Sequence, residues 1–168
     1  MPDPVLHTER LVLRPLDAER AGALLRPHAN GFPSDDDVMV LQGVLASGVD
    51  ARGCWVVEQD RQPIGTVGCA GALTAEGDQE LSYGLVVGAR GRGLATEAVG
   101  AACAHLERTA GVRRLTAEVR PGNSASMRVL HRLGFVPVAG ASEGHQLLAR
   151  AAPGRPAVRP HLAGRHVC

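Results

Sequence analysis

The sequence predicts one α+β domain built around a mixed β-sheet, and three features of the chain carry that prediction. Short apolar segments separated by turn residues between positions 54 and 87 are typical of a β-meander. An alanine-rich segment with helical periodicity, residues 94–108, follows through a glycine-rich loop. A further strand, helix and strand complete the pattern. The length of 168 residues fits a single domain of this class.

Elements before the meander are expected in the order strand, helix, helix. Residues 9–14 read as the first strand, because apolar residues stand between charged ones. Asp17 is a helix cap, and the helix that it starts is ended by Pro27. Residues 34–37 cap a second helix over residues 38–45.

The meander and the elements after it supply the rest of the sheet. Three strands are expected at residues 54–58, 64–73 and 79–87, with turns between them. After the long helix we expect, in order, a strand at 115–119, a helix at 124–133, a strand at 135–138 and its partner at 146–149. The domain therefore covers residues 1–151, and the Pro-, Arg- and His-rich residues 152–168 are predicted to form a flexible tail.

Composition excludes several classes of protein. An apolar fraction of 45%, a charged fraction of 21% and a net charge of +1 are typical of a globular domain. The near-neutral balance opposes nucleic-acid binding. No apolar run approaches the roughly 18–20 residues that span a bilayer, and no signal peptide starts the chain. We therefore expect a cytoplasmic protein without membrane partners.

The four cysteines show neither metal-ligand spacing nor a Cys-x-x-Cys motif. They stand at positions 54, 69, 103 and 168. In a reducing compartment we expect reduced core thiols and one thiol on the tail, and we expect no metal site.

The loop from Arg90 to Ala95 joins the third meander strand to the long helix. The first amides of a helix have no partners within it, and the helix dipole adds positive charge there. Glycines let a phosphate approach those amides, and arginines add charge-assisted hydrogen bonds. The loop is neither a P-loop nor a full Gly-x-Gly-x-x-Gly motif. From these residues alone, a phosphate site and a simple connecting turn both stay open.

Four segments, taken in order, resemble one known family. They are Thr8–Arg14, Glu80–Val87, the pattern Arg90-x-x-Gly93-x-Ala95-Thr96-Glu97-Ala98, and Asn123-x-x-Ser126 followed by Arg128-Val-Leu and Leu133-Gly134-Phe135. Together they resemble the GCN5-related N-acetyltransferases (GNAT), in the ribosomal-protein alanine acetyltransferase-like branch, over about residues 8–138. The resemblance implies the GNAT fold, a mostly antiparallel sheet flanked by helices and splayed between its fourth and fifth strands. It also implies acetyl-CoA as the acyl donor.

The resemblance assigns cofactor contacts to three places, namely the end of the fourth strand, the glycine-rich loop and the start of the following helix. A backbone N–H at Leu85 or Val86 would stabilise the oxyanion, and Val87 would pair with the pantetheine arm. The implied cofactor-binding residues are Leu85, Val86, Val87, Arg90, Gly91, Arg92, Gly93, Leu94, Ala95, Thr96, Asn123 and Ser126.

The resemblance also implies two side chains as candidates for proton transfer. Glu80 is the candidate base, acting directly or through water, and its alternative is a solvated carboxylate at the start of a strand. Ser126 is the candidate acid for the leaving thiolate, and its alternative is a serine that caps a helix. Tyr83 and Trp55 are expected in the core, and His28 lies in a loop on the acceptor side.

The implied reaction is direct attack of a primary amine on the thioester of acetyl-CoA. The acceptor is left open between a small-molecule amine and a protein N-terminus. The three aspartates at 35–37 either attract a cationic acceptor or only cap their helix. A catalytically idle acyl-CoA-binding or regulatory module is the alternative function. A homodimer through the C-terminal strands is one option for the oligomeric state.

Overall fold

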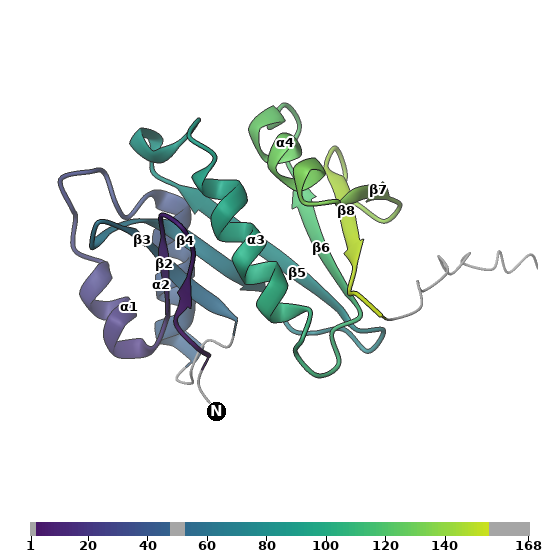
Figure 1. Ribbon diagram of the computed structural model, residues 1–168, viewed down its shortest axis with the longest axis horizontal. Helices are drawn as coiled ribbons and strands as arrows, with labels where there is room; N and C mark the ends of the chain where they lie inside the picture. Colours follow the sequence, from purple (N-terminus) through teal and green to yellow (C-terminus); the bar gives the residue numbers. More distant parts are fainter. Residues whose placement is uncertain (1–2, 48–52, 155–168) are drawn as a thin grey trace, which may run out of the picture.

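The computed structural model describes residues 3–47 and 53–154, and within them one eight-stranded sheet carries four α-helices (Figure 1). The strand order is β1-β2-β3-β4-β5-β6-β8-β7, and only the β5–β6 pair is parallel. The strands are β1 (Leu6–His7), β2 (Val12–Pro15), β3 (Cys54–Gln59), β4 (Gln62–Ala70), β5 (Asp78–Leu85), β6 (Arg114–Val119), β7 (Val136–Val138) and β8 (Gln146–Ala151). The helices are α1 (Ala18–Leu24), α2 (Asp35–Ser47), α3 (Leu94–Leu106) and α4 (Ser124–Arg132), and a 3₁₀ turn spans Val87–Ala89. The predicted α+β class with a mixed sheet is confirmed.

The predicted first strand over residues 9–14 is wrong in its first half. Instead, β1 and β2 form a hairpin whose turn contains Glu9 and Arg10. The Thr8 amide donates to the Leu11 carbonyl at 3.0 Å, and the Leu11 amide donates to Thr8 Oγ1 at 3.0 Å. The threonine hydroxyl therefore stabilises a turn within a stretch whose apolar pattern predicts a continuous strand.

The meander follows the prediction with shifted strand ends, because β3 extends one residue further and β4 and β5 both start and end earlier. β3 and β4 are joined at Asp60 and Arg61, whose φ angles of 50° and 64° suit a tight two-residue hairpin turn. β4 ends at Ala70 and not at Leu73. β5 ends at Leu85 because the next residues enter the 3₁₀ turn, so Val86 and Val87 lie outside the strand.

The sheet splays between β5 and β6, which are the fourth and fifth strands of the prediction. Their pairing covers only Asp78–Glu80 against Arg114–Thr116. At this closed end the Arg114 guanidinium pairs with the Asp78 carboxylate. Beyond Glu80 the two strands separate, and the gap widens toward Leu85, as the predicted fold requires.

The helices cover both faces of the sheet. On one face Tyr83 of β5 contacts α4, and Trp55 of β3 packs edge-to-face against His105 of α3. On the other face Thr66 of β4 donates to Asp37 of α2 at 2.8 Å. In Figure 1, α3 crosses the middle of the sheet, with α4 and strands β6–β8 on its right. Trp55 is fully buried, which confirms its predicted place in the core.

The cysteines of the described residues are free. Cys54 and Cys69 are half-buried, and Cys103 is buried. Burial raises the pKa of Cys69 and of Cys103 to about 12, so both thiols are protonated at neutral pH. Cys168 and the predicted tail beyond Gly154 lie outside the described residues.

Within residues 3–47 and 53–154, none of the helices has the length and the apolar character that crossing a membrane demands.

Candidate active site

A cleft of about 640 Å³ opens between the end of β5, the start of α3 and one side of α4. Nine of the twelve predicted cofactor-binding residues line it. They are Leu85, Arg90, Gly91, Gly93, Leu94, Ala95, Thr96, Asn123 and Ser126. The structure therefore brings the glycine-rich loop and the Asn123 segment, which are far apart in sequence, to the same cavity.

The start of α3 has the properties of an anion site. Gly93 is the N-cap, with φ 78°, and it supplies no side-chain hydrogen bond to the helix. The first helical bond runs from the Glu97 amide to the Gly93 carbonyl at 3.1 Å, which leaves the amides of Leu94, Ala95 and Thr96 without partners inside the helix. Both Gly91 and Gly93 have positive φ, which an L side chain rarely adopts. These residues fit the pyrophosphate of a CoA thioester.

Three arginines also line the cleft. Arg90 is anchored, because its Nε donates to the Leu85 carbonyl at 2.8 Å. Arg128 and Arg132 stand one turn apart on α4 and add two further cations. Neither was assigned a role from the sequence, although their i, i+4 spacing on a predicted helix is a signal that points to a shared face.

Three predicted cofactor residues are absent from the cleft lining. Arg92 turns away, and its Nη1 donates to Gln59 Oε1 at 3.3 Å. Val86 is buried in the core, whereas the Val87 side chain is 78% exposed. Val86 and Val87 leave the cleft because the 3₁₀ turn redirects the chain after Leu85.

The two amides considered for the oxyanion differ in their partners. The Val86 N–H donates to the Ile64 carbonyl of β4 at 2.8 Å, so it is already engaged. Amides alternate in direction along an antiparallel strand, so the Leu85 N–H points away from β4 and toward the gap between β5 and β6. The geometry therefore favours Leu85.

Ser126 and Tyr83 form a hydrogen-bonded pair in the cleft. Their hydroxyl oxygens lie 2.6 Å apart, and the Tyr83 hydroxyl also lies 3.3 Å from the Ser126 carbonyl. The Ser126 amide is capped by Asn123 Oδ1 at 3.1 Å, so Asn123, and not Ser126, is the N-cap of α4. Burial raises the pKa of the Tyr83 hydroxyl, which keeps it protonated. The expectation that Tyr83 only packs in the core is too narrow, because this residue also lines the cleft.

Glu80 lies at the point where β5 and β6 separate, outside the cleft lining. It is exposed, and its side chain points to the face opposite Tyr83 because side chains alternate along a strand. Burial raises the pKa of the Glu80 carboxyl, and the nearby Glu118 carboxylate raises it further. At about 3.3 Å per residue, Glu80 is roughly 16 Å along the strand from Leu85, which exceeds the reach of its side chain.

The acceptor side of the cleft also receives a residue from α2. Asp36 lines the cleft and lies 3.9 Å from Arg120 as an exposed pair. Asp37 is buried and bonds Ser34 and Thr66, so its role is structural. His28 is half-buried against Phe32 and is not part of the cleft lining.

Comparison with known proteins agrees with this geometry. Residues 10–136 match the model of the acetyltransferase (GNAT) domain family. The chain is 26% identical over 144 residues to an uncharacterized N-acetyltransferase p20 of Bacillus licheniformis, covering 77% of this chain and 81% of that protein.

Solved structures share the fold. RimJ of Mycobacterium smegmatis, solved in complex with CoA-disulfide, superposes with a TM-score of 0.62 and 24% identity, covering 84% of this chain and 82% of that one. The ribosomal-protein-S5-alanine acetyltransferase of Vibrio fischeri superposes with a TM-score of 0.69 and 21% identity, covering 92% of this chain and 100% of that one. The neighbours thus include the ribosomal-protein branch that the sequence motifs resemble.

Proposed function

The chain belongs to the GNAT acetyltransferase family and transfers an acetyl group from acetyl-CoA, and we propose that its acceptor is a cationic primary amine. The observation that carries the proposal is the position of the cleft. Its donor half presents the helix amides and arginines, and it lies next to a splayed strand whose far side carries carboxylates. An idle acyl-CoA-binding module is not favoured, because the site also holds groups suited to proton transfer.

The donor half would bind acetyl-CoA through charge and backbone amides. The N-terminal amides of α3 and the loop glycines would hold the pyrophosphate. Arg90, Arg128 and Arg132 would neutralise the phosphates. Bound in this way, the cosubstrate supplies a thioester carbon that is open to nucleophilic attack.

The splayed end of β5 would stabilise the charge that develops on the thioester oxygen. We assign this role to the Leu85 N–H, because its neighbour at Val86 already donates to Ile64. A fixed backbone donor aimed at a developing oxyanion lowers the barrier without reorganisation.

Ser126 would donate a proton to the leaving thiolate. The single Tyr83 proton can be donated to the Ser126 carbonyl or to Ser126 Oγ. When it is donated to Oγ, the serine proton is free to point into the cleft. The raised pKa of Tyr83 keeps the tyrosine proton in place at neutral pH. Tyr83 would therefore orient the serine hydroxyl.

Glu80 would act as a base through water. Because Glu80 is roughly 16 Å along β5 from Leu85, we assign it this role through a water chain and not by direct contact with the amine. A raised pKa brings the basicity of this carboxylate closer to that of the ammonium it must deprotonate.

The acceptor half favours a positively charged substrate. Asp36 lines the cleft, and Glu80 with the nearby Glu118 adds negative charge on the strands outside its lining. Arg120, which lies 3.9 Å from Asp36, is exposed and only loosely paired. A protein N-terminus satisfies this preference, and the name of the Vibrio fischeri structural neighbour points to an acceptor of that kind. A small-molecule polyamine is the alternative source of the same charge.

The function is tested by following thiol release from acetyl-CoA with three acceptors. They are short peptides with a free N-terminal alanine or serine, a polyamine such as spermidine, and a free neutral amino acid. Turnover with peptides or polyamine, and none with the neutral amino acid, supports the proposal. Preference for an anionic or neutral acceptor contradicts the proposed charge selection, and no turnover with any amine contradicts the proposed reaction.

Asp36→Asn and Asp35→Asn provide a matched pair for the acceptor side. Both aspartates are exposed in the first turn of α2, but only Asp36 lines the cleft. We expect Asp36→Asn to raise KM for the cationic acceptor several-fold, roughly the effect of one exposed charge pair, and Asp35→Asn to leave it unchanged.

Two further features stay predictions of the sequence. A homodimer would use β7, which is the outer edge strand of the sheet and carries the exposed Val136. Light scattering of the full chain tests it. A cytoplasmic location is tested by fractionation of the producing cell.

A further inference from the structure

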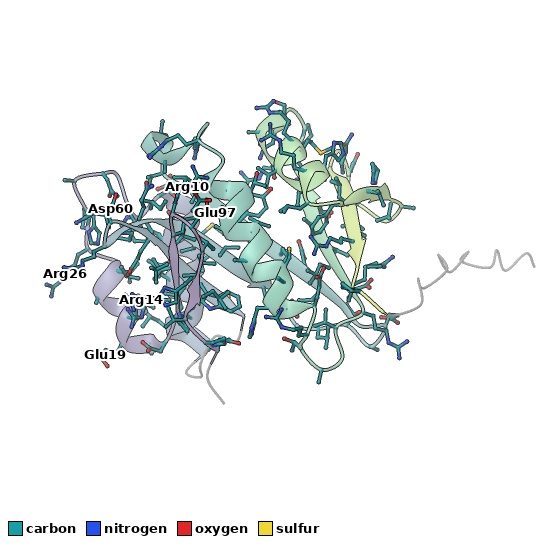
Figure 2. All side chains as sticks on the ribbon, viewed as in Figure 1. Arg10, Arg14, Glu19, Arg26, Asp60 and Glu97 are labelled. Carbon is teal, nitrogen blue, oxygen red and sulfur yellow. The ribbon has the colours of Figure 1, made fainter. Side chains whose placement is uncertain are left out.

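Arg10, in the turn between β1 and β2, contacts the start of α3 in two ways. Its guanidinium holds the Glu97 carboxylate, with both Nε and Nη2 at 2.7 Å from Oε2. Its Nη1 donates to the Arg92 carbonyl in the glycine-rich loop at 3.0 Å. Figure 2 shows Arg10 and Glu97 side by side where the hairpin meets the helix. One side chain thus joins the hairpin, the helix and the loop.

The bond to Arg92 determines which way one peptide group faces. In a trans peptide, the C=O of residue 92 and the N–H of residue 93 point in opposite directions. The carbonyl points to Arg10, which does not line the cleft, and Gly93 does line it. The Gly93 N–H is therefore directed away from the hairpin, toward the side where the cleft lies.

This peptide group needs an external constraint. Its orientation depends on ψ of Arg92 and on φ of Gly93, which is 78°, and glycine has the widest choice of backbone angles. A rotated peptide would turn the Arg92 carbonyl toward the cleft and oppose the binding of phosphate. A single hydrogen bond to a charged donor disfavours that rotation.

The contact with Glu97 also neutralises a negative charge close to the proposed phosphate site. Glu97 lies in the first turn of α3, where its negative charge would repel a phosphate bound at the same helix end. Burial raises the pKa of Glu97, but hydrogen bonds from Thr8 and Arg10 outweigh it and lower that pKa. Thr8 Oγ1 lies 2.6 Å from Oε1, and the Arg10 amide donates to the same oxygen at 2.8 Å. The carboxylate is therefore ionised, neutralised and held outside the cleft.

We propose that Arg10 is a positioning residue for the acetyl-CoA site, which orients the Arg92–Gly93 peptide and neutralises Glu97. The inference rests on the proposed use of the cleft, because it predicts an effect on the pyrophosphate subsite alone. Arg10 touches neither the acceptor half nor Ser126, so its loss should leave the chemical step intact.

The test compares Arg10→Ala with Arg14→Ala in the full chain. Arg14 is a matched control, because it pairs with Glu58 at 2.8 Å and its side chain is 40% exposed, against 43% for Arg10. In both pairs the carboxylate partner is 16% exposed. Figure 2 shows Arg14 further along the hairpin, away from α3. Both variants therefore lose a partly exposed arginine–glutamate pair, but only Arg10→Ala also loses a contact with the glycine-rich loop.

Two donors separate a positioning effect from a general one. Acetyl-CoA carries the pyrophosphate, whereas acetyl-pantetheine carries the same thioester without it. We expect Arg10→Ala to raise the Kd for CoA and the KM for acetyl-CoA about tenfold, with kcat nearly unchanged. The kcat/KM for acetyl-pantetheine should stay at the wild-type value, and Arg14→Ala should match the wild type with both donors.

Arg10→Lys keeps the proposal testable if Arg10→Ala unfolds. Lysine can pair with Glu97, but its compact ammonium cannot also hold the Arg92 carbonyl as the guanidinium fork does. A CoA affinity lowered in Arg10→Lys, with the thermal unfolding midpoint of the wild type, supports the proposal. Unchanged CoA affinity in this variant, or an equal loss with both donors, overturns it. Failure of the wild-type chain to bind CoA instead overturns the proposed function on which the inference rests.

Discussion

The two halves of the cleft differ in whether backbone groups or side chains form them. The donor half consists mainly of backbone, because the free amides at the start of α3 and the loop glycines form its floor. We assign the acceptor half to side chains from separate elements, with Asp36 of α2 in the cleft lining and with Glu80 of β5 and Glu118 of β6 outside that lining. Groups of the backbone are common to every sequence that forms the loop, whereas side chains can be exchanged one at a time. The donor half is therefore suited to one cosubstrate, and we expect the proposed acceptor half to determine which amine is used.

The largest effect is expected from Gly93→Glu, which changes the donor half of the cleft. The Cβ of the new side chain would lie 3.5 Å from Arg10 Nη2, so its carboxylate would compete for the guanidinium that orients the loop and would add negative charge that repels phosphate at the start of α3. A non-glycine residue at φ 78° also adds backbone strain of about 1–2 kcal/mol. We predict a loss of CoA affinity of roughly 100-fold or more, about 2.7 kcal/mol, in calorimetric titration.

Two glycine variants control this experiment. Gly93→Ala retains the strain without the charge, so it should bind more tightly than Gly93→Glu. Gly43 lies on the exposed side of α2, where an added Cβ meets no atom within 4 Å, and Gly43→Glu should bind CoA like the wild type. Wild-type affinity in Gly93→Glu would mean that the loop is only a connecting turn.

The second prediction concerns the base in the acceptor half. Glu80→Gln should lower kcat by about 100-fold while leaving the Kd for CoA unchanged, because the residue lies outside the donor contacts. Glu76→Gln, in the exposed turn before β5, is the control and should behave as the wild type. A wild-type kcat in Glu80→Gln would show that this carboxylate is a solvated side chain without a role in catalysis.

A smaller effect is expected where the two halves meet. Ser126→Ala and Tyr83→Phe should each lower kcat by roughly tenfold or less, because a thiolate leaves readily without a proton donor. Since the two hydroxyls lie 2.6 Å apart, the double variant should lose little more than Ser126→Ala alone. Additive losses in stopped-assay kinetics would show that the residues act separately.

The smallest effect is a shift in the pH profile. Burial and the Glu118 charge raise the pKa of Glu80, and a base works only when deprotonated, so the rate should fall on the acid side as Glu80 is protonated. Glu118 itself stays ionised there, because the Ser142 amide donates to it at 2.6 Å and lowers its pKa. Glu118→Gln should therefore move the acid limb of kcat/KM to lower pH. If the acid limb of kcat/KM did not move, the titration of Glu80 would not be the cause of the pH dependence.

The difference between local backbone features and side chains from separate elements also explains which features could be predicted from the sequence. The helix start at Gly93 and the cap at Asn123 are local, since each depends on residues within one turn of the chain. The strands of the meander were likewise predicted from alternation and turn residues, and the family motifs located the splay. These features need no knowledge of distant partners.

Contacts between distant residues were not predicted. Tyr83 and Ser126 are 43 positions apart, and Arg10 and Glu97 are 87 positions apart. The hairpin turn at Glu9 and Arg10 falls within a predicted strand, because the apolar pattern shows neither the bonds between Thr8 and Leu11 that close the turn nor the bond from Arg10 to the distant Glu97. Arg92 was expected at the phosphate because of its charge, but Gln59 on β3 holds it elsewhere. Each of these differences arises from tertiary packing that overrides a local preference.

The most direct test of the account is calorimetric titration of the full chain with CoA, in parallel with Gly93→Glu. We predict one site per chain with a Kd of roughly micromolar order for the wild type, and a Kd raised roughly 100-fold or more for the variant. Absence of binding to the wild type, or equal binding to both proteins, would contradict the central claim that the cleft at the start of α3 holds the acyl donor.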